Sequence, residues 1–379
     1  MKTFYFDAAA TTPVRPEVLA AMLPYFTDKF YNPNSSYPQA IEVRDDVEAA
    51  RKTIARFINA EPDEIYFTSG GSESNCMALR GFKDSRIISS ALTTEIEHHS
   101  TLACVKDSFK DYVIFPVDNK GVFNPDDLEF FLKEYRDRND FKHRIFSIIG
   151  ANNEIGTIQD LMSIGSIARK YGIIFHVDAV QMFGHSPIDV KMMDIDMLSA
   201  SAHKIGGPKG CGFIYISNRL ATMAPIIFGT QEKAMRGGTL NVTGIIGMAK
   251  AVEMCNVDNQ NLKAARDHMV KRLKEFGCKL NGPSGNNRLY NNINVTFPEP
   301  VVAEQLIYLL GESGVLCSAG SACNEGSPLP SHVLKAIGLS DEEAGRTVRF
   351  TLPEDTTIED INEAMTVIET ALMMIGVTK

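Results

Sequence analysis

Between about residues 60 and 220, short apolar runs alternate with stretches of helical periodicity. Several of these runs are apolar over nearly their whole length, which is typical of strands buried on both faces of a sheet. Because helical stretches separate most of them, the pattern predicts an α/β fold whose mostly parallel sheet is covered by helices on both faces. The seven predicted strands are residues 64–68, 86–90, 112–117, 144–149, 173–178, 196–199 and 212–217.

The pattern changes in the last third of the chain. A helical pattern over 242–276, with Asn241 as a plausible cap, precedes strands and helices in mixed order. At 379 residues the chain is long enough for two domains. We expect a large domain over 16–255 and a smaller α+β domain made of 1–15 and 256–379, joined by the long helix. The other predicted elements are helices at 16–26 and 39–58, packed across both domains, strands at 292–297 and 347–352, and helices at 302–313 and from 358.

Composition and charge argue against several classes of protein. The net charge of −9 gives no general basic footprint, which argues against nucleic acid as the main ligand. No apolar run approaches the roughly 20 residues that span a bilayer, and an acid at position 7 interrupts any signal-peptide core, so we expect a cytoplasmic location. The cysteines form neither a Cys-x-x-Cys pair nor a cluster with zinc spacing, so we expect reduced thiols and no metal site. They stand at positions 76, 104, 211, 255, 278, 317 and 323.

A single lysine follows the predicted strand at 196–199. Small residues come first, His203 then precedes Lys204, and a glycine turn follows. Small side chains leave a concave space beside the amine, and a lysine removed from water becomes a nucleophile toward carbonyls. Such an amine can form a Schiff base with the aldehyde of pyridoxal 5'-phosphate (PLP). The alternative is a surface lysine that enters a loop.

Two residues near another strand end have roles around a pyridine ring. Asp178 closes the apolar strand at 173–178, where an ionised carboxylate is costly unless it is paired. A protonated ring nitrogen is a suitable partner; the alternative is an Asp that caps the next turn. Three residues later, the amide of Gln181 could donate to the phenolate oxygen of the ring.

A glycine turn at 68–74 joins a strand to a helix and contains Gly71 and Ser72. Free backbone N–H groups at such a junction bind phosphate. The turn lacks the lysine of the nucleotide-binding phosphate loop, so a cofactor phosphate is favoured over ATP. The alternative is an ordinary capping box formed by Ser72 and its neighbours.

Further polar residues follow the strands at 86–90 and 144–149. His98 and His99 open a helix, where an imidazole can stack on a ring and move protons near neutral pH, or else simply pack at the surface. Asn153, in the segment 152–156, offers an amide to the ring substituent and to a substrate. Ligands of open α/β sheets bind beyond the carboxyl ends of the strands, which is where all these features fall. Together they predict a PLP site.

Two residues of the last third stand out. Cys323 is flanked by glycine, serine and alanine, with prolines following, which describes an exposed thiol on a mobile loop; the alternative is an idle loop cysteine. Arg349 lies in an apolar strand and needs an anionic partner. The carboxylate of an amino-acid substrate fits its fork, and a structural salt bridge is the competing interpretation.

These motifs resemble those of the NifS/IscS-like cysteine desulfurases, which belong to the class V aminotransferases and have PLP fold type I. The resemblance runs essentially from end to end of the chain. Its motifs are residues 7–13, 67–70, 97–98, 152–157, 176–181, 199–210, 236–241, 320–323 and 330–335.

The resemblance implies roles for individual residues. Lys204 would bind the cofactor covalently, Asp178 would pair with the ring nitrogen, and His98 would stack on the ring. Thr239 would reach the phosphate of a neighbouring subunit, which makes a homodimer the functional unit. The remaining implied contacts are Gln181 and Asn153 near the ring oxygen, Gly71, Ser72, Ser201 and His203 around the phosphate, and Arg349 with Asn153 on the substrate carboxylate.

The implied reaction converts L-cysteine to L-alanine. Lys204 would take the Cα proton, Cys323 would attack the substrate sulfur and keep it as a persulfide, and His98 would exchange a proton with a thiol. The persulfide would pass to an acceptor such as an iron–sulfur scaffold protein. The alternatives are a selenocysteine lyase, another class V PLP enzyme such as an aminotransferase, or a non-catalytic partner-binding protein on the same fold.

Overall fold

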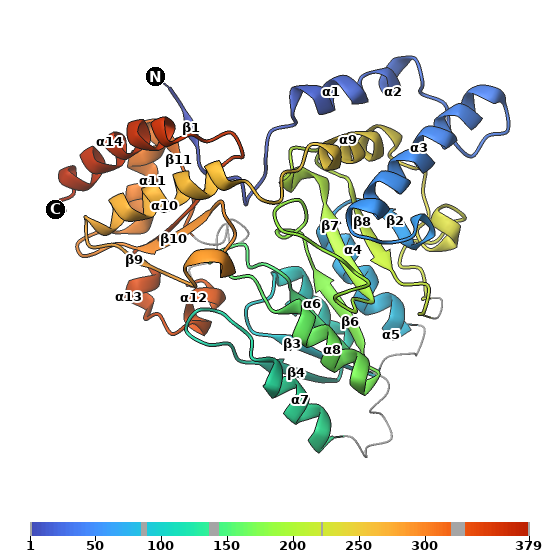
Figure 1. The fold of residues 1–379 in the computed structure, drawn as a ribbon, viewed down its shortest axis with the longest axis horizontal. Coiled ribbons are helices and arrows are strands. Elements are labelled where there is room, and N and C mark those ends of the chain that lie inside the picture. The colour runs from blue at the N-terminus through green and yellow to red at the C-terminus, as the bar shows by residue number, and fades with distance from the viewer. Residues whose placement is uncertain (1, 85–88, 136–143, 221–222, 320–329, 378–379) are drawn as a thin grey trace.

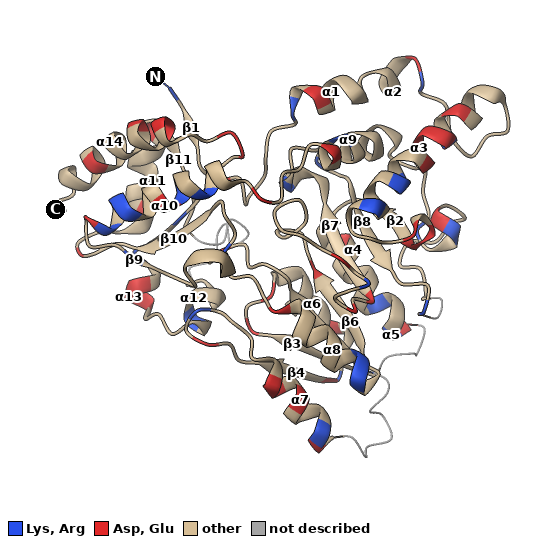
Figure 2. Ribbon diagram, viewed as in Figure 1, with Lys and Arg blue, Asp and Glu red and all other residues tan. Residues whose placement is uncertain are grey.

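The computed structural model describes residues 2–84, 89–135, 144–220, 223–319 and 330–377 (Figure 1). Cys323 therefore lies outside the described residues. Within them, no helix combines the length and the apolar character needed to cross a membrane. Figure 2 shows both acidic and basic residues on the outer helices α3 (Pro38–Phe57) and α10 (Gln260–Lys274), whereas α14 (Ile358–Met374) carries acidic residues only.

A seven-stranded sheet forms the larger part of the molecule. Five adjacent strands, from β7 to the edge strand β4, run parallel, and β8 runs antiparallel to both of its neighbours, so the predicted α/β fold with a mostly parallel sheet is confirmed. The order across the sheet is β2 (Ile65–Thr68), β8 (Gly212–Ile216), β7 (Met197–Ser201), β6 (Ile174–Asp178), β5 (Arg144–Ile149), β3 (Ser90–Thr94) and β4 (Asp111–Phe115).

Helices cover both faces of this sheet. On one face, buried residues of the helices pack with alternate strand residues such as Phe175 and Val177. On the other face, the opposite set of strand residues, including Ile145 and Met197, packs with the remaining helices. The first face carries α1 (Pro16–Met22), α3, α7 (Pro125–Glu134), α8 (Leu161–Tyr171) and α9 (Val242–Glu253); the second carries α4 (Gly71–Cys76), the π-helical turn Met77–Gly81, α5 (Phe82–Asp84) and α6 (His99–Ser108).

One strand lies later than predicted. The sequence favoured 86–90, whereas the structure places β3 at Ser90–Thr94, and residues 86–88 are outside the described part of the chain. The register explains the difference, because Ser90 pairs with Asp111 of β4 and with Arg144 of β5. Its serine and threonines are fully buried there, a placement that the apolar pattern did not indicate.

A second, smaller unit has its own sheet and core. The central strand β10 (Asn292–Thr296) pairs antiparallel with β9 (Lys279–Leu280) and β12 (Thr347–Thr351), and β1 (Phe4–Tyr5) from the N-terminus pairs with β11 (Val315–Leu316). The predicted smaller α+β unit is therefore present (Figure 1). Its helices are α10, α11 (Ala303–Glu312) and α14. Two short helices, α12 (His332–Ala336) and α13 (Asp341–Ala344), belong to a separate small cluster that also contains Ile96, Ile149 and Ile155.

Three helix predictions need correction. The single helix over 242–276 is wrong: α9 ends at Glu253 and α10 begins at Gln260, because the Asn259 side chain accepts from the N–H of Leu262 and caps a new helix. The helix at 16–26 is two helices, since Pro24 begins α2 (Pro24–Thr27). The N-terminal helices pack on the large sheet and not across both units. The domain boundaries at 15/16 and 255/256 stay a prediction.

Candidate active site

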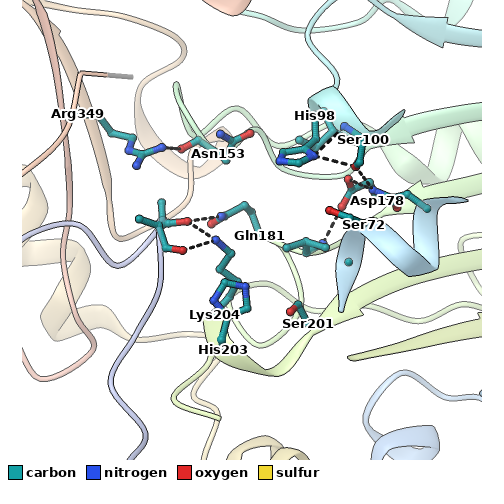
Figure 3. A pocket seen from close by; sticks show the side chains of 16 residues that line it. Ser72, His98, Ser100, Asn153, Asp178, Gln181, Ser201, His203, Lys204 and Arg349 are labelled. Atoms are coloured by element: carbon teal, nitrogen blue, oxygen red, sulfur yellow. Dashed lines mark hydrogen bonds between the residues drawn. The ribbon is translucent and has the colours of Figure 1, made fainter. Parts of the chain in front are cut away.

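A cavity of about 430 Å³ opens at the carboxyl ends of β5, β6 and β7 (Figure 3). It lies between the two units, because residues of the large sheet, the N-terminal segment and β12 all contribute to its wall. Ten of the twelve predicted site residues line it. These are Gly71, Ser72, His98, Asn153, Asp178, Gln181, Ser201, His203, Lys204 and Arg349; Thr239 does not line it and Cys323 is outside the described residues.

The amine of Lys204 is held by backbone oxygens of the N-terminal segment. Lys204 ends a short 3-10 turn that follows β7, and its Nζ donates to the carbonyl oxygens of Ala9 at 2.6 Å and Ala10 at 2.8 Å. Gln181 Nε2 donates to the same Ala9 oxygen at 2.9 Å. The Ala9 N–H in turn donates to the hydroxyl of Thr351, so this segment bridges the small unit to the lysine. The sequence does not predict these two carbonyl contacts, because every residue has a backbone carbonyl and the pattern of side chains does not distinguish them.

Asp178 is buried at the end of β6, and the donors that it meets among the described residues are neutral. Its Oδ2 accepts from Asn75 Nδ2 at 2.7 Å, and its Oδ1 accepts from the N–H of Val180 at 3.0 Å. The Val180 contact is the turn cap that was the alternative interpretation, and the same carboxylate also lines the cavity. In the part of the chain that is described, it forms no ion pair with a cationic side chain. A carboxylate so placed suits a cationic ligand.

The His98 ring lies against the cavity with a defined proton position. His98 is the N-cap of α6, and its Nδ1 accepts from the N–H of Ser100 at 3.1 Å. Because a backbone N–H can only donate, Nδ1 carries no proton, and the neutral ring is protonated at Nε2. Burial lowers the pKa of His98, and the charge of Lys204 adds to that effect while Asp178 opposes it. Surface packing, the alternative interpretation, is therefore wrong for this residue.

The glycine turn after β2 shapes the far end of the cavity. A Cβ at Gly71 would lie 2.4 Å from Val180 Cγ2, so only glycine fits at that position. The N-cap of α4 is Gly70, and Glu73 accepts from the N–H of Ser69, so the alternative of a capping box formed by Ser72 is not what the structure contains.

His203 adds a neutral side chain at the same end. Its Nδ1 lies 3.1 Å from Thr11 Oγ1, and burial, with the charges of Lys204 and Lys209, lowers its pKa to about 4. Gly71, Ser72, Ser201 and His203 also surround an adjoining hollow that contains Lys209. Backbone N–H groups, hydroxyls and an ammonium are groups that bind a phosphate.

Arg349 forms the opposite wall, within the small sheet. Its Nη2 donates to Asp7 Oδ1 at 2.8 Å and its Nη1 to the carbonyl oxygen of Asn153 at 3.1 Å. The structural salt bridge is thus present, and the guanidinium lines the cavity as well. Its buried Nε has no hydrogen-bond partner among the described residues. The first motif of the resemblance contained Asp7 without assigning it a role.

The chain is anchored on both sides of residues 320–329 beside this wall. Ser318 and Arg349 exchange two backbone hydrogen bonds, of 2.7 and 3.2 Å. On the other side, Ser331 Oγ donates to the buried carboxylate of Glu154 at 2.6 Å. No pattern in the sequence indicates this contact of Glu154, because the two residues are far apart in the chain. The described chain on either side of residues 320–329 is thus held by hydrogen bonds, at Ser318 on one side and at Ser331 on the other.

The comparisons with known proteins agree over almost the whole chain. A family model described as aminotransferase class-V matches residues 4–363. The cysteine desulfurase IscS of Methanosarcina thermophila is 41% identical, covering 97% of this chain and 91% of that protein. The cysteine desulfurase IscS of Dictyoglomus turgidum is 42% identical, covering 96% and 93%.

Solved structures show the same fold. A NifS-like protein superposes with a TM-score of 0.88 at 32% identity, covering 98% of this chain and 100% of that one. A structure titled SspA in complex with cysteine superposes with a TM-score of 0.80 at 36% identity, covering 93% and 99%. The similarity includes both units, since either alignment covers more than nine-tenths of the chain.

Proposed function

Because the chain belongs to the class-V aminotransferase family and is a cysteine desulfurase, we propose that Lys204, His98 and Cys323 are its catalytic residues. The reaction takes the sulfur of L-cysteine and releases L-alanine. The observation that supports the residue roles most strongly is that Lys204, Asp178, His98 and Arg349, from distant parts of the chain, line one cavity.

The cavity fits PLP as the cofactor. It offers an amine at one wall, a buried carboxylate with two neutral donors at another, and a glycine turn with hydroxyls at its far end. When bound, PLP supplies an electron sink that stabilises the negative charge left on the substrate Cα. Lys204, Asp178, His98, Gln181 and Asn153 would hold its ring. Gly71, Ser72, Ser201 and His203 would hold its phosphate.

Lys204 and His98 are the side chains proposed to transfer protons. Once its amine is neutral, Lys204 can accept the Cα proton of the substrate, and the carbonyl oxygens of Ala9 and Ala10 fix where Nζ lies. His98 is neutral near pH 7 because its pKa is lowered, and it holds a proton on Nε2 at the cavity wall. It is therefore placed to donate a proton to a sulfur or carbon of the substrate.

Arg349 is the proposed partner of the substrate carboxylate. Its position is fixed by Asp7 and by the Asn153 carbonyl, and its Nε has no partner in the described residues. A cationic fork held in this way favours a planar anion. Because Asn153 belongs to the same wall, its amide would complete the contact.

Cys323 is the proposed sulfur acceptor. Its thiolate would attack the substrate sulfur, so that an S–S bond forms, the substrate Cβ–S bond breaks, and the bonding pair goes to the substrate carbon, which is protonated to give alanine. The anchored flanks at Ser318 and Ser331 support this role, because they fix both ends of the intervening segment beside Arg349 and Glu154. The persulfide would pass to a protein acceptor, of which an iron–sulfur scaffold is the proposed one.

We also propose that the functional unit is a homodimer. Large apolar side chains are exposed along α1, α2 and the following loop, among them Leu23 at 55%, Phe26 at 59% and Phe30 at 63%. A surface of this kind on a chain of this size suits a second copy. Thr239, which does not line the cavity of its own chain, would then contact the cofactor phosphate of the partner subunit. The cytoplasmic location stays a prediction.

The activity is tested by product analysis. Purified protein with PLP and L-cysteine should form L-alanine without any 2-oxo acid, and with a reducing thiol it should release sulfide in equal amount. A requirement for a 2-oxo acid would identify an aminotransferase. Turnover of L-selenocysteine with none of L-cysteine would identify a selenocysteine lyase.

A further inference from the structure

Residues 227–239 form a closed loop between the large sheet and α9, here named the 227–239 loop. The N–H of Gly237 donates to the carbonyl oxygen of Ile227 at 2.9 Å and closes its neck. Thr239, at its end, is exposed. None of the residues 227–239 lines either hollow of the cofactor site in their own chain.

The middle of this loop has an unfavourable backbone conformation. Glu232, Lys233 and Ala234 have φ angles of 47°, 55° and 64°. In this left-handed region the Cβ of an L-residue crowds the following carbonyl oxygen, and runs of such residues are rare. A conformation of this kind persists only where the surrounding contacts hold it, and it occurs often at ligand-binding sites.

A buried ion pair supplies those contacts. Arg51 of α3 reaches Glu232 with two hydrogen bonds, Nη2 to Oε1 at 2.7 Å and Nη1 to Oε2 at 2.9 Å. The two side chains are 9% and 1% exposed. Such a two-bond arrangement fixes the orientation of both groups as well as their separation. The carboxylate of Glu232 therefore fixes the left-handed turn relative to α3.

The same pair attaches the loop to the edge of the large sheet. Glu232 Oε2 accepts from the N–H of Phe67 at 2.7 Å, and Arg51 Nη1 donates to the carbonyl oxygen of Ile65 at 2.6 Å. Both backbone groups belong to β2, the outermost strand, which leads into the glycine turn of the phosphate end. The ion pair thus makes hydrogen bonds to backbone groups of β2 that a neighbouring strand could otherwise make.

From these contacts we propose that Arg51 and Glu232 are positioning residues, which hold the 227–239 loop so that Thr239 can reach the cofactor phosphate of the partner subunit. The inference rests on the proposed homodimer and on the proposed role of Thr239. It explains how an exposed threonine is held in position. The Arg51–Glu232 ion pair, which is buried in the large unit, holds residues 232–234, and this backbone segment leads to Thr239.

The same loop is also connected to the glycine turn of its own subunit. Arg236 of the loop donates to Glu73 Oε1 at 2.8 Å, and Glu73 accepts from Ser69 in the glycine turn of its own chain. Through these residues, or through β2, the ion pair could act on the phosphate site of its own subunit. The two roles differ in which subunit of a dimer loses cofactor affinity, and mixed dimers distinguish them.

The test uses the double variant Arg51→Met/Glu232→Gln, which leaves no buried unpaired charge. In its homodimer, the dissociation constant for PLP should rise about tenfold, as expected for one lost hydrogen bond to a charged group. Binding of pyridoxal, which lacks the phosphate, should be unchanged. The matched control is Arg272→Met/Glu369→Gln, which removes an ion pair between α10 and α14 and should leave both affinities unchanged. Thermal unfolding of each apo-protein accounts for any loss of stability.

Mixed dimers with Lys204→Ala subunits then locate the effect. In each mixed dimer, one subunit carries the tested variant and keeps Lys204, and the other carries Lys204→Ala and keeps an intact loop. Only the site that contains Lys204 gives the visible absorbance of the lysine-bound cofactor, and this site receives the intact loop from the partner subunit. The PLP affinity of that site should return to the wild-type value, for the double variant and for Thr239→Ala alike. If the PLP affinity recovers for Thr239→Ala but not for the double variant, the positioning role of Arg51 and Glu232 is overturned and the dimer proposal stands. If the PLP affinity recovers for neither variant, the proposed role of Thr239 itself is overturned.

Discussion

The two walls of the cavity are built in different ways. The wall that belongs to the large sheet consists of short segments at strand ends, and two of its side chains have a contact only two residues away: Asp178 with Val180, and His98 with Ser100. Distant contacts then add to this wall, from Asn75 to Asp178 and from Lys204 to Ala9 and Ala10. The opposite wall depends on Arg349, whose hydrogen bonds to Asp7 and to Asn153 span 342 and 196 residues of the chain. The first wall is suited to holding a cofactor permanently, whereas the second brings together the groups proposed to meet the substrate.

The largest expected effect is at the cofactor wall. Replacement of Lys204 by alanine removes the group proposed to bind the cofactor and to move the Cα proton. Turnover of L-cysteine should fall by about 10³-fold or more, and the visible absorbance of the bound cofactor should change. Near-ultraviolet circular dichroism of the apo-protein should match the wild type, which separates lost chemistry from lost fold. Turnover near the wild-type level would contradict the role of this wall.

Asp178→Asn tests the same wall through charge alone. An amide is nearly isosteric and can still accept from Val180, but it cannot stabilise a protonated ring nitrogen. We expect kcat to fall by about 10²-fold with a smaller change in KM. Asn75→Ala, which removes only the neutral donor to Asp178, is the matched control and should have a much smaller effect. Equal losses in the two variants would mean that the carboxylate acts only by packing.

The opposite wall should respond in KM more than in kcat. Arg349→Lys keeps a positive charge but loses the fork, so KM for L-cysteine should rise about tenfold. The affinity for PLP should be unchanged, because Arg349 belongs to the substrate wall. Steady-state kinetics at saturating PLP measure the first quantity, and a cofactor titration measures the second. A weaker cofactor affinity with an unchanged KM would reverse the assignment of the two walls.

The smallest effect concerns acid stability, and it should also distinguish the two units. His176, in the middle of β6, lies between Ser147 and Ser199 and is fully buried, which lowers its pKa to about 3. The unfolded chain takes up a proton near the ordinary pKa of 6.5 and the folded chain does not. This residue therefore reduces the free energy of unfolding by up to about 1.4 kcal/mol per pH unit as the pH falls from 6.5 toward 3, and not above that range.

Hydrogen exchange followed by peptide between pH 7 and pH 5 measures this difference. The buried His185 and the partly buried His203 of the large unit, whose pKa values are lowered to about 4, act in the same direction. Burial raises the pKa of Asp196 to about 7 and also raises that of Glu97, and these two carboxyls of the same unit act in the opposite direction. The contribution of His176 is therefore measured by comparing His176→Gln with the wild type: the variant should lose less protection in the large sheet on going from pH 7 to pH 5, with no change in β10 and β12. An equal change in both units, or none in the large sheet, would contradict this expectation.

The same contrast explains what could be predicted from the sequence. Lys204, Asp178, His98 and the glycine turn each follow a strand, so the position of the strand end was enough to place them in one cavity. Asn75, Asp7 and the carbonyls of Ala9 and Ala10 could not be assigned, because their contacts depend on how distant segments meet. Arg349 was recognised as unusual, but only the structure shows that it has Asp7 as a partner and still lines the cavity.

The predicted elements were wrong where polar residues, and not apolar periodicity, determine the structure. Periodicity alone continued one helix through 254–259, although Asn256, Asp258 and Asn259 favour caps and turns, and the cap formed by Asn259 ends that pattern. The strand at Ser90–Thr94 is rich in small polar residues, so its burial could be known only from its two neighbouring strands.

The central claim is that sulfur leaves L-cysteine at this cavity and is received by the thiol of residue 323. Peptide mass spectrometry after a short incubation with L-cysteine tests it most directly. The account predicts an adduct of about 32 Da, one sulfur atom, on the peptide that contains Cys323, and no such adduct in Cys323→Ala, which should keep its bound cofactor. An adduct on another cysteine, or undiminished alanine formation by Cys323→Ala, would contradict it.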